Sequence, residues 1–235
     1  MKIGKRLVSR KQTGAQFLLF LSFLLVAALF SCIPLTAEEE GWQPVMVQQE
    51  VKVYKRMKEG SRFFEFKAVG SLSGTISDYV SVLLETESMP HWVPLCIEAQ
   101  NIEQINDRET IIYVACKGVW PVADREYTAR RVLIRDPAIG AIRLDIELVD
   151  RQDTHKVARR VKISHLKSHW ILKKIDSTHT HVELYADVDP GGWLPAWLVN
   201  SGYRKVPYRF LRELEIQVAD RFRRIPVVAT VTLHP

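Results

Sequence analysis

Histidine and cysteine are the side chains here best suited to hold a metal or to act as nucleophiles. His165 and His169 lie four residues apart, but in a pattern that predicts a strand. His179 and His181 share a face with Glu183 in a second strand pattern, so we expect both groups on solvated faces of a sheet. The sequence has no H-E-x-x-H motif, no nucleophile elbow, and no Ser or Cys with an evident His partner. We therefore predict no metal site, no cofactor and no catalytic constellation.

Cys96 and Cys116 flank a predicted hairpin whose turn we place at Asn106-Asp107. In one register Cys96 faces Lys117, and a shift of one residue places it opposite Cys116. We expect two small buried thiols, because free cysteine is among the most buried residue types. The alternative is a disulfide, which would persist in an oxidising compartment. Neither cysteine has C-x-x-C spacing, so the pair does not indicate zinc.

The segment between Pro190 and Asn200 carries no charge. It indicates either a site that binds an apolar group or a set of side chains that fill one end of the hydrophobic core. Its Gly191-Gly192 pair supplies backbone conformations that other residues rarely adopt, and Pro195 suits a first helical turn. We therefore expect a hinge followed by an apolar helix start. Two tryptophans four residues apart are predicted to share a face of that turn. They either form a gate that lines a cavity or touches a membrane interface, or they plug one end of the core. The side chains concerned are Trp193, Leu194, Trp197 and Leu198.

Two further segments offer candidate contacts. The connection Gly118–Ala123, "GVWPVA", is more apolar than a loop tip usually is. We therefore expect Trp120 to be shielded from solvent by a group that packs on it. In "REYTARRVLIR", Tyr127 and Arg131 share one face with apolar residues. A buried cation must be paired or hydrogen-bonded. Arg131 is therefore expected either to meet a polar group of a ligand or to bond elsewhere in the protein.

The first 37 residues have the layout of a secretory signal peptide. Basic residues precede the uncharged run Phe17–Phe30, and small residues then lead to a cleavage site after Ala37. We expect cleavage and export to the periplasm. The two alternatives are a lipoprotein leader with Cys32 lipidated, and a membrane anchor retained over residues 17–35.

Net charge argues against nucleic-acid binding. The chain has 33 Lys and Arg against 27 Asp and Glu, but five of the basic residues lie before Phe17. From Glu38 onward 28 basic residues face 27 acidic ones, a net charge of +1. The apparent basicity belongs to the leader, so we predict no nucleic-acid partner.

Periodicity predicts an α+β domain over residues 42–225, followed by a tail at 226–235. A short helix is expected at Thr75–Glu85 and one long helix after Pro195, kinked or delayed by Pro207. Alternation of apolar and polar residues predicts a large antiparallel sheet that curls around the long helix. The expected strands are Val51–Arg56, Arg62–Gly70, Glu98–Ile105, Glu109–Cys116, Arg125–Ile134, Ala141–Val149, His165–Ile175 and Thr180–Val188.

Several short sequence motifs along this chain resemble those of the START (steroidogenic-acute-regulatory-related lipid transfer) domain. They are "VYKR" at Val53–Arg56, "FKAVG" at Phe66–Gly70, "HWVP" at His91–Pro94, "WPVADREY" at Trp120–Tyr127 and "DPGGWLPAWLVN" at Asp189–Asn200, with Pro207 following. Their order and spacing cover about Trp42 to Phe222. One departure is that the first helix of animal members is missing or very short here, since only Glu40–Val47 precede the first strand.

The resemblance implies a helix-grip fold with a hydrophobic tunnel that takes up one lipid, such as a sterol or phospholipid. It favours a gate or lining role for at least one of the two tryptophans. Arg131 occupies the position of the cavity arginine in some animal members, but their partner carboxylate aligns near Ile112, so that pair is broken here. Arg125 is expected to be a structural ion-pair residue. The implied lipid-binding residues are Trp92, Trp120, Tyr127, Arg131, Trp170, Trp193, Leu194, Trp197, Leu198 and Tyr203.

The expected function is therefore binding and transfer of one lipid by a monomer that touches membranes transiently. Two alternatives differ in class: an enzyme of the same fold acting on an apolar substrate, and a scaffold whose cavity is filled by its own side chains. A lipid that copurifies with the protein, turnover of an added lipid, or a cavity that accepts nothing would separate the three.

Overall fold

The computed structural model describes residues 41–118, 120–138, 140–151, 159–202 and 205–223. Contacts divide the chain into two compact units, Met1–Glu40 and Gly41–Pro235. The predicted leader and the predicted tail lie outside the described residues. Within those residues, no helix has the length and apolar character needed to cross a bilayer.

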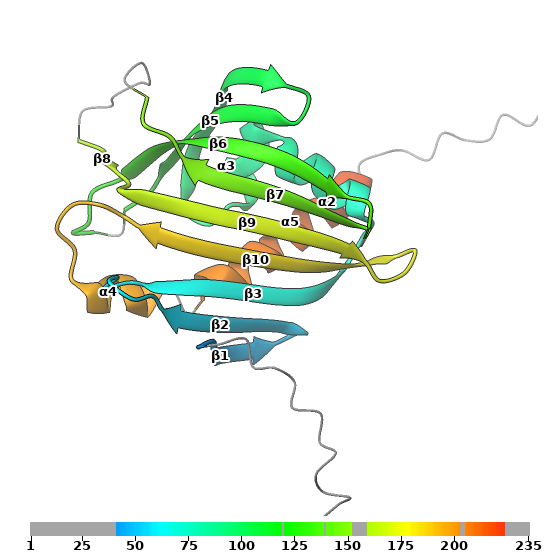
Figure 1. The fold of residues 1–235 in the computed structure, drawn as a ribbon, viewed down its shortest axis with the longest axis horizontal. Helices are drawn as coiled ribbons and strands as arrows, with labels where there is room; N and C mark the ends of the chain where they lie inside the picture. The colour runs from blue at the N-terminus through cyan, green and yellow to red at the C-terminus, as the bar shows by residue number, and fades with distance from the viewer. Residues whose placement is uncertain (1–40, 119, 139, 152–158, 203–204, 224–235) are drawn as a thin grey trace, which may run out of the picture. The chain divides into compact units, whose positions relative to one another are not determined.

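One ten-stranded sheet forms the body of the second unit (Figure 1). Its order is β1-β2-β3-β10-β9-β7-β6-β5-β4, with every neighbouring pair antiparallel, and β8 pairs with β6 in parallel. The strands are β1 (Gln43–Gln48), β2 (Val51–Met57), β3 (Phe64–Ser73), β4 (Cys96–Asn106), β5 (Glu109–Cys116), β6 (Arg125–Asp136), β7 (Ala141–Leu148), β8 (Val161–Lys162), β9 (His165–Lys174) and β10 (His179–Asp189).

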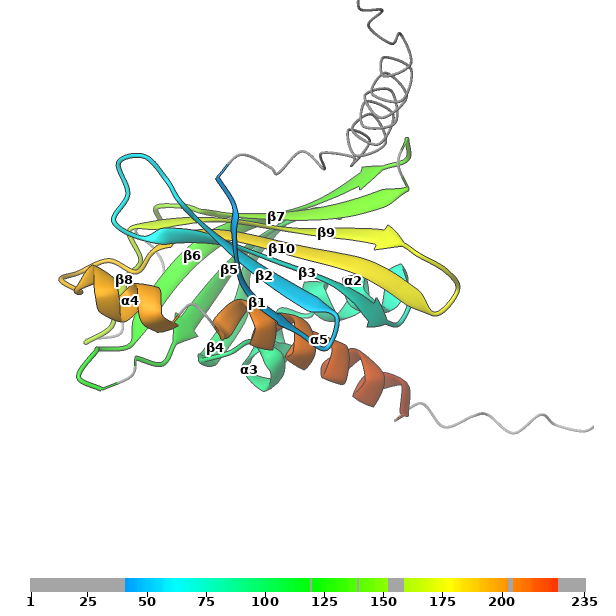
Figure 2. The ribbon, with the colours of Figure 1, turned by 90° about the horizontal axis from the view of Figure 1, so that it is seen from below.

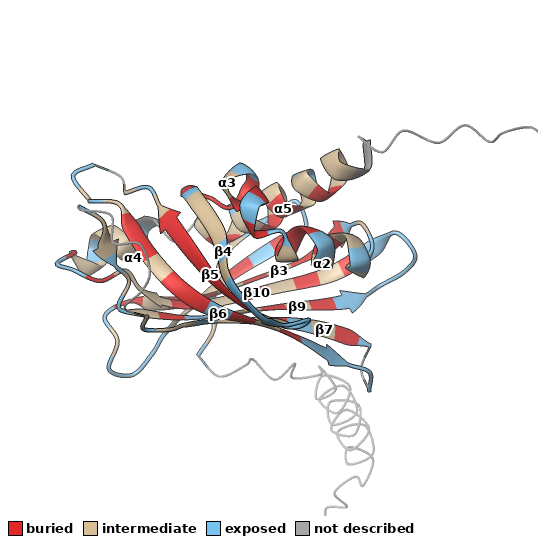
Figure 3. Cartoon of the chain, turned by 90° about the horizontal axis from the view of Figure 1, so that it is seen from above, coloured by how far each residue is buried: buried red, intermediate tan, exposed pale blue. Residues whose placement is uncertain are grey.

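The helices gather on the concave side of this sheet (Figure 2). They are α2 (Ile76–Leu84), the 3₁₀ turn η1 (Thr86–Ser88), α3 (Met89–Trp92), α4 (Ala196–Gly202) and α5 (Val206–Arg223). Buried residues lie on the face of the sheet that α2, α3 and α5 cover (Figure 3). A curved antiparallel sheet grips a C-terminal helix, which confirms the predicted α+β helix-grip class.

Alternation along β3 explains how α5 packs on the sheet. Leu72 points to the helix side and is fully buried, as are Leu211 and Leu214 of α5. Gly70 lies between them, where an added Cβ would be 3.1 Å from Val51 and 3.4 Å from Leu211. The missing side chain therefore lets α5 approach the sheet closely.

Helix α2 forms where the sequence predicts it and begins with a capping box. Thr75 accepts from the Asp78 backbone N–H, and the Asp78 side chain accepts from the Thr75 N–H. Tyr79 is fully buried, and its hydroxyl donates to the Ser73 carbonyl at 2.6 Å. The end of β3 and helix α2 are thus joined directly.

The predicted long C-terminal helix is present as α5, delayed to Val206, and a separate shorter helix, α4, occupies the start of the stretch after Pro195. Pro207 has no N–H to donate and cannot sit in a helix interior without a clash, but it fits the first turn of α5. The eight predicted strands are all present, whereas β1, β8 and α3 were not predicted. The hairpin turn is also one residue later than predicted, at Asp107-Arg108, since Asn106 pairs with Glu109.

Candidate functional site

A cavity of about 550 Å³ lies between the concave face of the sheet and the helices. Strands β3, β5, β6, β7, β9 and β10 supply its wall, together with α3, α4, the start of α5 and the β5–β6 connection. Its lining is mainly apolar. The lining residues that were not among the predicted lipid contacts include Phe66, Ile112, Leu144, Leu166 and Leu184 on strands and Phe210 on α5.

Three aromatic rings form a continuous part of this wall. Trp92 of α3 and Trp170 of β9 meet edge to face with ring centroids 6.3 Å apart. Trp170 meets Phe210 of α5 in the same way at 6.2 Å. Both tryptophans are buried and line the cavity. The rings therefore connect one helix, the sheet and the C-terminal helix around a single space.

The other inward-facing candidates come from β6 and the segment before α5. Tyr127, Leu194 and Leu198 line the cavity. Burial raises the pKa of the Tyr127 phenol well above its ordinary value, so the hydroxyl stays neutral. Tyr203 lies outside the described residues.

Arg131 is a buried cation in the cavity wall, as the alternation predicts. Only 4% of the residue is exposed. Its Nη1 donates to the Leu83 carbonyl at 3.2 Å and its Nη2 to the Leu84 carbonyl at 3.0 Å, which caps the C-terminal end of α2. Burial lowers the pKa of this guanidinium to about 10, so it remains protonated at neutral pH.

Two buried donors in this wall have no hydrogen-bond partner among the described residues. They are Nε of Arg131 and Nε1 of Trp92. A buried donor left without a partner costs roughly 1–3 kcal/mol, and most such groups in proteins are satisfied by protein, water or ligand. Arg131 and Trp92 both line the apolar cavity, so its wall contains two buried N–H groups that have no partner among the described residues.

The exposed tryptophans lie at the same end of the sheet, which Figures 1 and 2 both show through α4 and the β5–β6 connection. Trp120 is 90% exposed at the cavity rim, Trp193 86% and Trp197 72%. Neither Trp193 nor Trp197 lines the cavity or plugs the core. Trp193 precedes α4, so the two do not share a helical turn. The leucines that follow each of them, Leu194 and Leu198, face inward instead.

The double glycine before α4 has the left-handed backbone that its sequence predicts. The φ angles of Gly191 and Gly192 are 70° and 65°. An added Cβ on Gly191 would lie 2.2 Å from the carbonyl oxygen of Lys162 in β8. The Pro195 carbonyl accepts from the Leu198 and Val199 N–H groups and starts the helix. The position of α4 therefore depends on a close approach of two backbones.

Arg125 holds the same region but is not the ion-pair residue that was expected. Its Nη1 donates to the Ala123 carbonyl and its Nε to the Pro190 carbonyl at 3.4 Å. The partners are backbone oxygens, because Arg125 is buried where the β5–β6 connection passes the end of β10. Burial lowers the pKa of its guanidinium.

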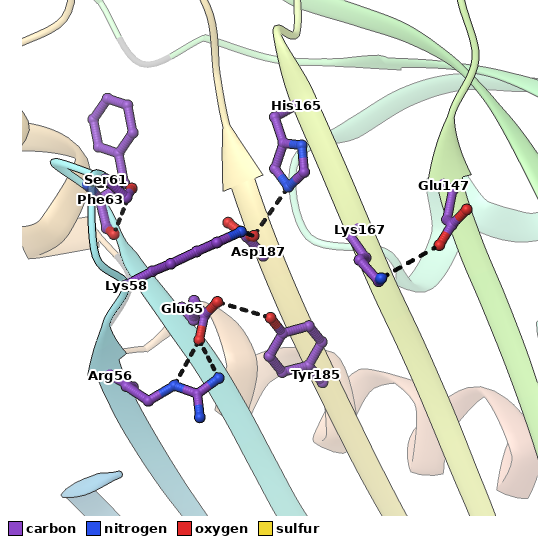
Figure 4. Close-up of polar contacts among 10 residues, drawn as sticks. All are labelled: Arg56, Lys58, Ser61, Phe63, Glu65, Glu147, His165, Lys167, Tyr185 and Asp187. Atoms are coloured by element: carbon purple, nitrogen blue, oxygen red, sulfur yellow. Dashed lines mark hydrogen bonds and ion pairs between the residues drawn. The ribbon is translucent and has the colours of Figure 1, made fainter. Parts of the chain in front are cut away.

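On the opposite face of the sheet, carboxylates join neighbouring strands (Figure 4). Asp187 accepts from Lys58 Nζ at 2.7 Å and lies 3.0 Å from His165 Nε2. Glu65 bonds Arg56 Nε at 2.7 Å and the Tyr185 hydroxyl at 3.0 Å. Arg56 of β2 pairs with Glu65, and Lys58 in the β2–β3 connection pairs with Asp187, so this face carries a structural polar network.

The histidines that suggested a metal belong to this outer face. His169 stacks on Tyr185 with centroids 4.8 Å apart, and burial together with nearby Arg143 lowers the pKa of its imidazole. His179 lies at the hairpin turn beside Asp176. In the part of the chain that the structure describes, no three His, Cys, Asp or Glu residues are grouped to hold a metal ion.

Comparison with known proteins places these features in a family context. The START domain matches residues 34–219 of this chain. An uncharacterised protein of Pseudomonas aeruginosa is 22% identical over 198 residues, covering 84% of this chain and 96% of that protein. The human phosphatidylcholine transfer protein is 20% identical over 177 residues, covering 74% of this chain and 81% of its own length.

Solved structures share the fold. A fragment of the STAR-related lipid transfer protein from Xanthomonas axonopodis is 26% identical with a TM-score of 0.70, covering 77% of this chain and 99% of the fragment. The Zhui aromatase/cyclase of a Streptomyces species shares the fold at 13% identity, with a TM-score of 0.51, over 68% of this chain and 96% of the enzyme.

Proposed function

This chain belongs to the START domain family, and we propose that it binds one lipid molecule in the cavity described above and transfers it between membranes. Lipid binding or transfer in general is supported by the relatives, one of which is named for phosphatidylcholine transfer. The observation that carries the proposal for this chain is the apolar cavity with two donors that have no partner among the described residues. At about 550 Å³ its volume falls within the roughly 300–1,000 Å³ typical of sites for one small molecule.

The two donors define how the lipid is oriented in this proposal. Its hydrocarbon part packs on Trp92, Trp170 and Phe210, and a phosphate, carbonyl or hydroxyl oxygen accepts from Arg131 Nε and Trp92 Nε1. A charge-assisted hydrogen bond in a dry site is stronger than a neutral one. The lipid therefore places its polar group toward α2 and α3, whose residues adjoin both donors.

We propose that α4 and the β5–β6 connection separate when the lipid enters or leaves. The two segments face each other across the cavity rim, where they contribute Leu198 and Trp120. The exposed Trp120 and Trp197 of these segments, together with Trp193 just before α4, would rest in the interfacial region of a membrane, where indole rings are favoured. A lipid could then pass from bilayer to cavity without exposing its chains to water.

The site of action that we propose is the periplasm or cell envelope, with the protein acting as a monomer. Support for this location comes from the leader alone: a basic start, an uncharged core and a small-residue exit within residues 1–37. N-terminal sequencing of the cell-associated protein tests this proposal. A mature chain that begins near Glu38 in the periplasmic fraction agrees with it, and an intact Met1 in the membrane fraction contradicts it.

Native mass spectrometry tests the lipid proposal directly. The wild type, mixed with vesicles of bacterial phospholipid, should acquire one lipid per chain. Ala186→Phe adds a ring inside the cavity and should abolish this adduct, while Lys174→Phe adds the same ring at an exposed position and should not. Wild-type protein that folds but acquires no lipid would contradict the proposal.

An enzyme remains the second candidate because one solved structure of this fold is an aromatase/cyclase. The same incubation distinguishes it. Recovery of the added lipid unchanged after many exchanges agrees with transfer, whereas a product of altered mass would indicate catalysis.

A further inference from the structure

Cys96 and Cys116 are direct partners on neighbouring strands. The stretch of β4 that follows Cys96 pairs with β5 in the register that sets Glu98 opposite Ala115 and Asn101 opposite Ile112. A register shift between Cys96 and Glu98 then moves Cys96 from a position opposite Lys117 to one opposite Cys116. The irregularity at the start of β4 thus brings the two thiols onto the same face of the sheet.

The hydrogen bonds around the pair show which kind of cross-strand position it occupies. The Lys117 N–H donates to the Leu95 carbonyl at 2.7 Å, and these residues flank the two cysteines. In an antiparallel ladder that bond borders a non-hydrogen-bonded pair, whose Cα atoms are about 4.5 Å apart and whose side chains are closest. A disulfide requires a Cα separation of roughly 4.4–6.8 Å.

One cysteine of the pair lies in the cavity wall and the other directly behind it. Cys116 lines the cavity and is half-buried, and Cys96 is buried in the adjoining core. A small reagent can therefore reach Cys116 through the cavity. Both thiols are free in this structure.

We propose that Cys96 and Cys116 form a reversible thiol–disulfide pair in the wall of the cavity. The Cys116 thiolate attacks a low-molecular-weight disulfide such as oxidised glutathione, giving a mixed disulfide and one glutathione thiol. The Cys96 thiolate then attacks Cys116 Sγ, forms the intramolecular bond and expels the second glutathione. Each cysteine loses its proton, and the two electrons that the pair loses reduce the reagent to two thiols.

The bond would join two segments of the rim. Cys96 follows Val93–Leu95, and Cys116 precedes Lys117 and Gly118, all of which line the cavity. Cross-linking them closes a loop through β4 and β5 and restricts the unfolded chain. The oxidised form should therefore unfold at a temperature several degrees higher than the reduced form.

Protonation sets the rate of this reaction. Burial raises the pKa of the Cys96 thiol to about 11 and that of the Cys116 thiol to about 12. Because the thiolate is the reacting species, oxidation should be slow at neutral pH. Its rate should rise about tenfold for each unit by which the pH is increased, as long as the pH stays below these pKa values.

Tryptic mapping of the full chain after incubation with oxidised glutathione at about pH 9 tests the proposal independently of lipid binding. Trypsin separates the cysteines into peptides 68–108 and 109–117, so only a disulfide links them. The expected result is this linked pair, released by reductant, together with the rise in melting temperature. Cys96→Ser and Cys116→Ser should each give at most a mixed disulfide.

Three results would overturn the proposal. They are unlinked peptides with free thiols, glutathione on both cysteines without a cross-link, and a cross-link from either cysteine to Cys32. None of them bears on whether the cavity takes a lipid, so the two proposals fail separately.

Discussion

Asn200 in α4 and Phe64 at the start of β3 are joined by a hydrogen bond, from the Phe64 N–H to Asn200 Oδ1 at 3.1 Å. The amide nitrogen of Asn200 donates to the Arg62 carbonyl at 3.2 Å. One side chain thus attaches the helix at the cavity rim to the β2–β3 connection. That connection is anchored in turn to the sheet by the ion pair between Lys58 and Asp187.

We expect Asn200→Ala to speed lipid exchange several-fold with a small loss of stability, about 1 kcal/mol for the lost hydrogen bonds. Dissociation of a fluorescent lipid in stopped flow measures the rate, and urea unfolding measures the stability. Asn200→Asp keeps the acceptor for Phe64 and loses only the donor, so its rate should lie between the two. Equal rates in all three proteins would mean that α4 does not limit exchange.

Gly191→Ala should destabilise the protein strongly, because the new Cβ would lie 2.2 Å from the Lys162 carbonyl. Gly60→Ala is the matched control, since Gly60 also has a left-handed φ but nothing lies within 4 Å of the added atom. The control should lose about 1 kcal/mol and Gly191→Ala clearly more, by thermal unfolding. Equal losses would show that the contact with β8 is unimportant.

The exposed tryptophans should matter for membranes and not for folding. We expect Trp193→Ala and Trp197→Ala to change unfolding free energy by less than about 1 kcal/mol and to weaken binding to vesicles in a sedimentation assay. Trp170→Ala, which truncates a buried ring, should cost about 3–5 kcal/mol. Normal vesicle binding by the double variant of Trp193 and Trp197 would contradict the proposed membrane contact.

Arg131→Met keeps an unbranched side chain in the wall and removes the guanidinium. Affinity for a lipid with a phosphate or hydroxyl should fall by roughly 10-fold to 100-fold, the equivalent of one hydrogen bond to a charged group. An apolar probe without oxygen atoms should bind both proteins equally in a fluorescence titration. If affinity for both ligands falls together, Arg131 acts on the shape of the cavity and not on the polar group.

Acid should weaken the network on the outer face. Burial alone would raise the pKa of Asp187. The hydrogen bonds from Lys58 and His165 together outweigh that effect, so the net pKa is below the ordinary 3.8. A carboxylate with a depressed folded pKa stabilises above its unfolded pKa, and that stability is lost as pH falls through the folded value.

Urea unfolding at neutral pH and below about pH 4 checks this prediction. Asp187→Asn should be less stable than the wild type at neutral pH, and the difference should shrink in acid. Glu147→Gln is the control, because its ion pair with Lys167 spans 3.7 Å between two half-exposed side chains and should contribute little at any pH. A constant difference across pH would mean that Asp187 acts through packing alone.

Sequence periodicity determined eight of the ten strands, the inward face of β6, and α2, because those patterns are local and repeat along an element. Alternation placed Arg131 on the cavity side, the resemblance implied Trp170 as a lipid contact, and the structure has both residues in the cavity wall. The START-like motifs determined the family, because their order along the chain can be recognised without a structure.

Only the tertiary structure decided which residues of the Pro190–Asn200 segment face the cavity. Two left-handed glycines and a contact with β8, about 30 residues earlier in sequence, orient this segment. They turn Leu194 inward and leave Trp193 in solvent. The pairing of Cys96 with Cys116 likewise follows from one irregular step in a ladder. Composition and spacing cannot encode such steps, because they arise where distant backbones meet.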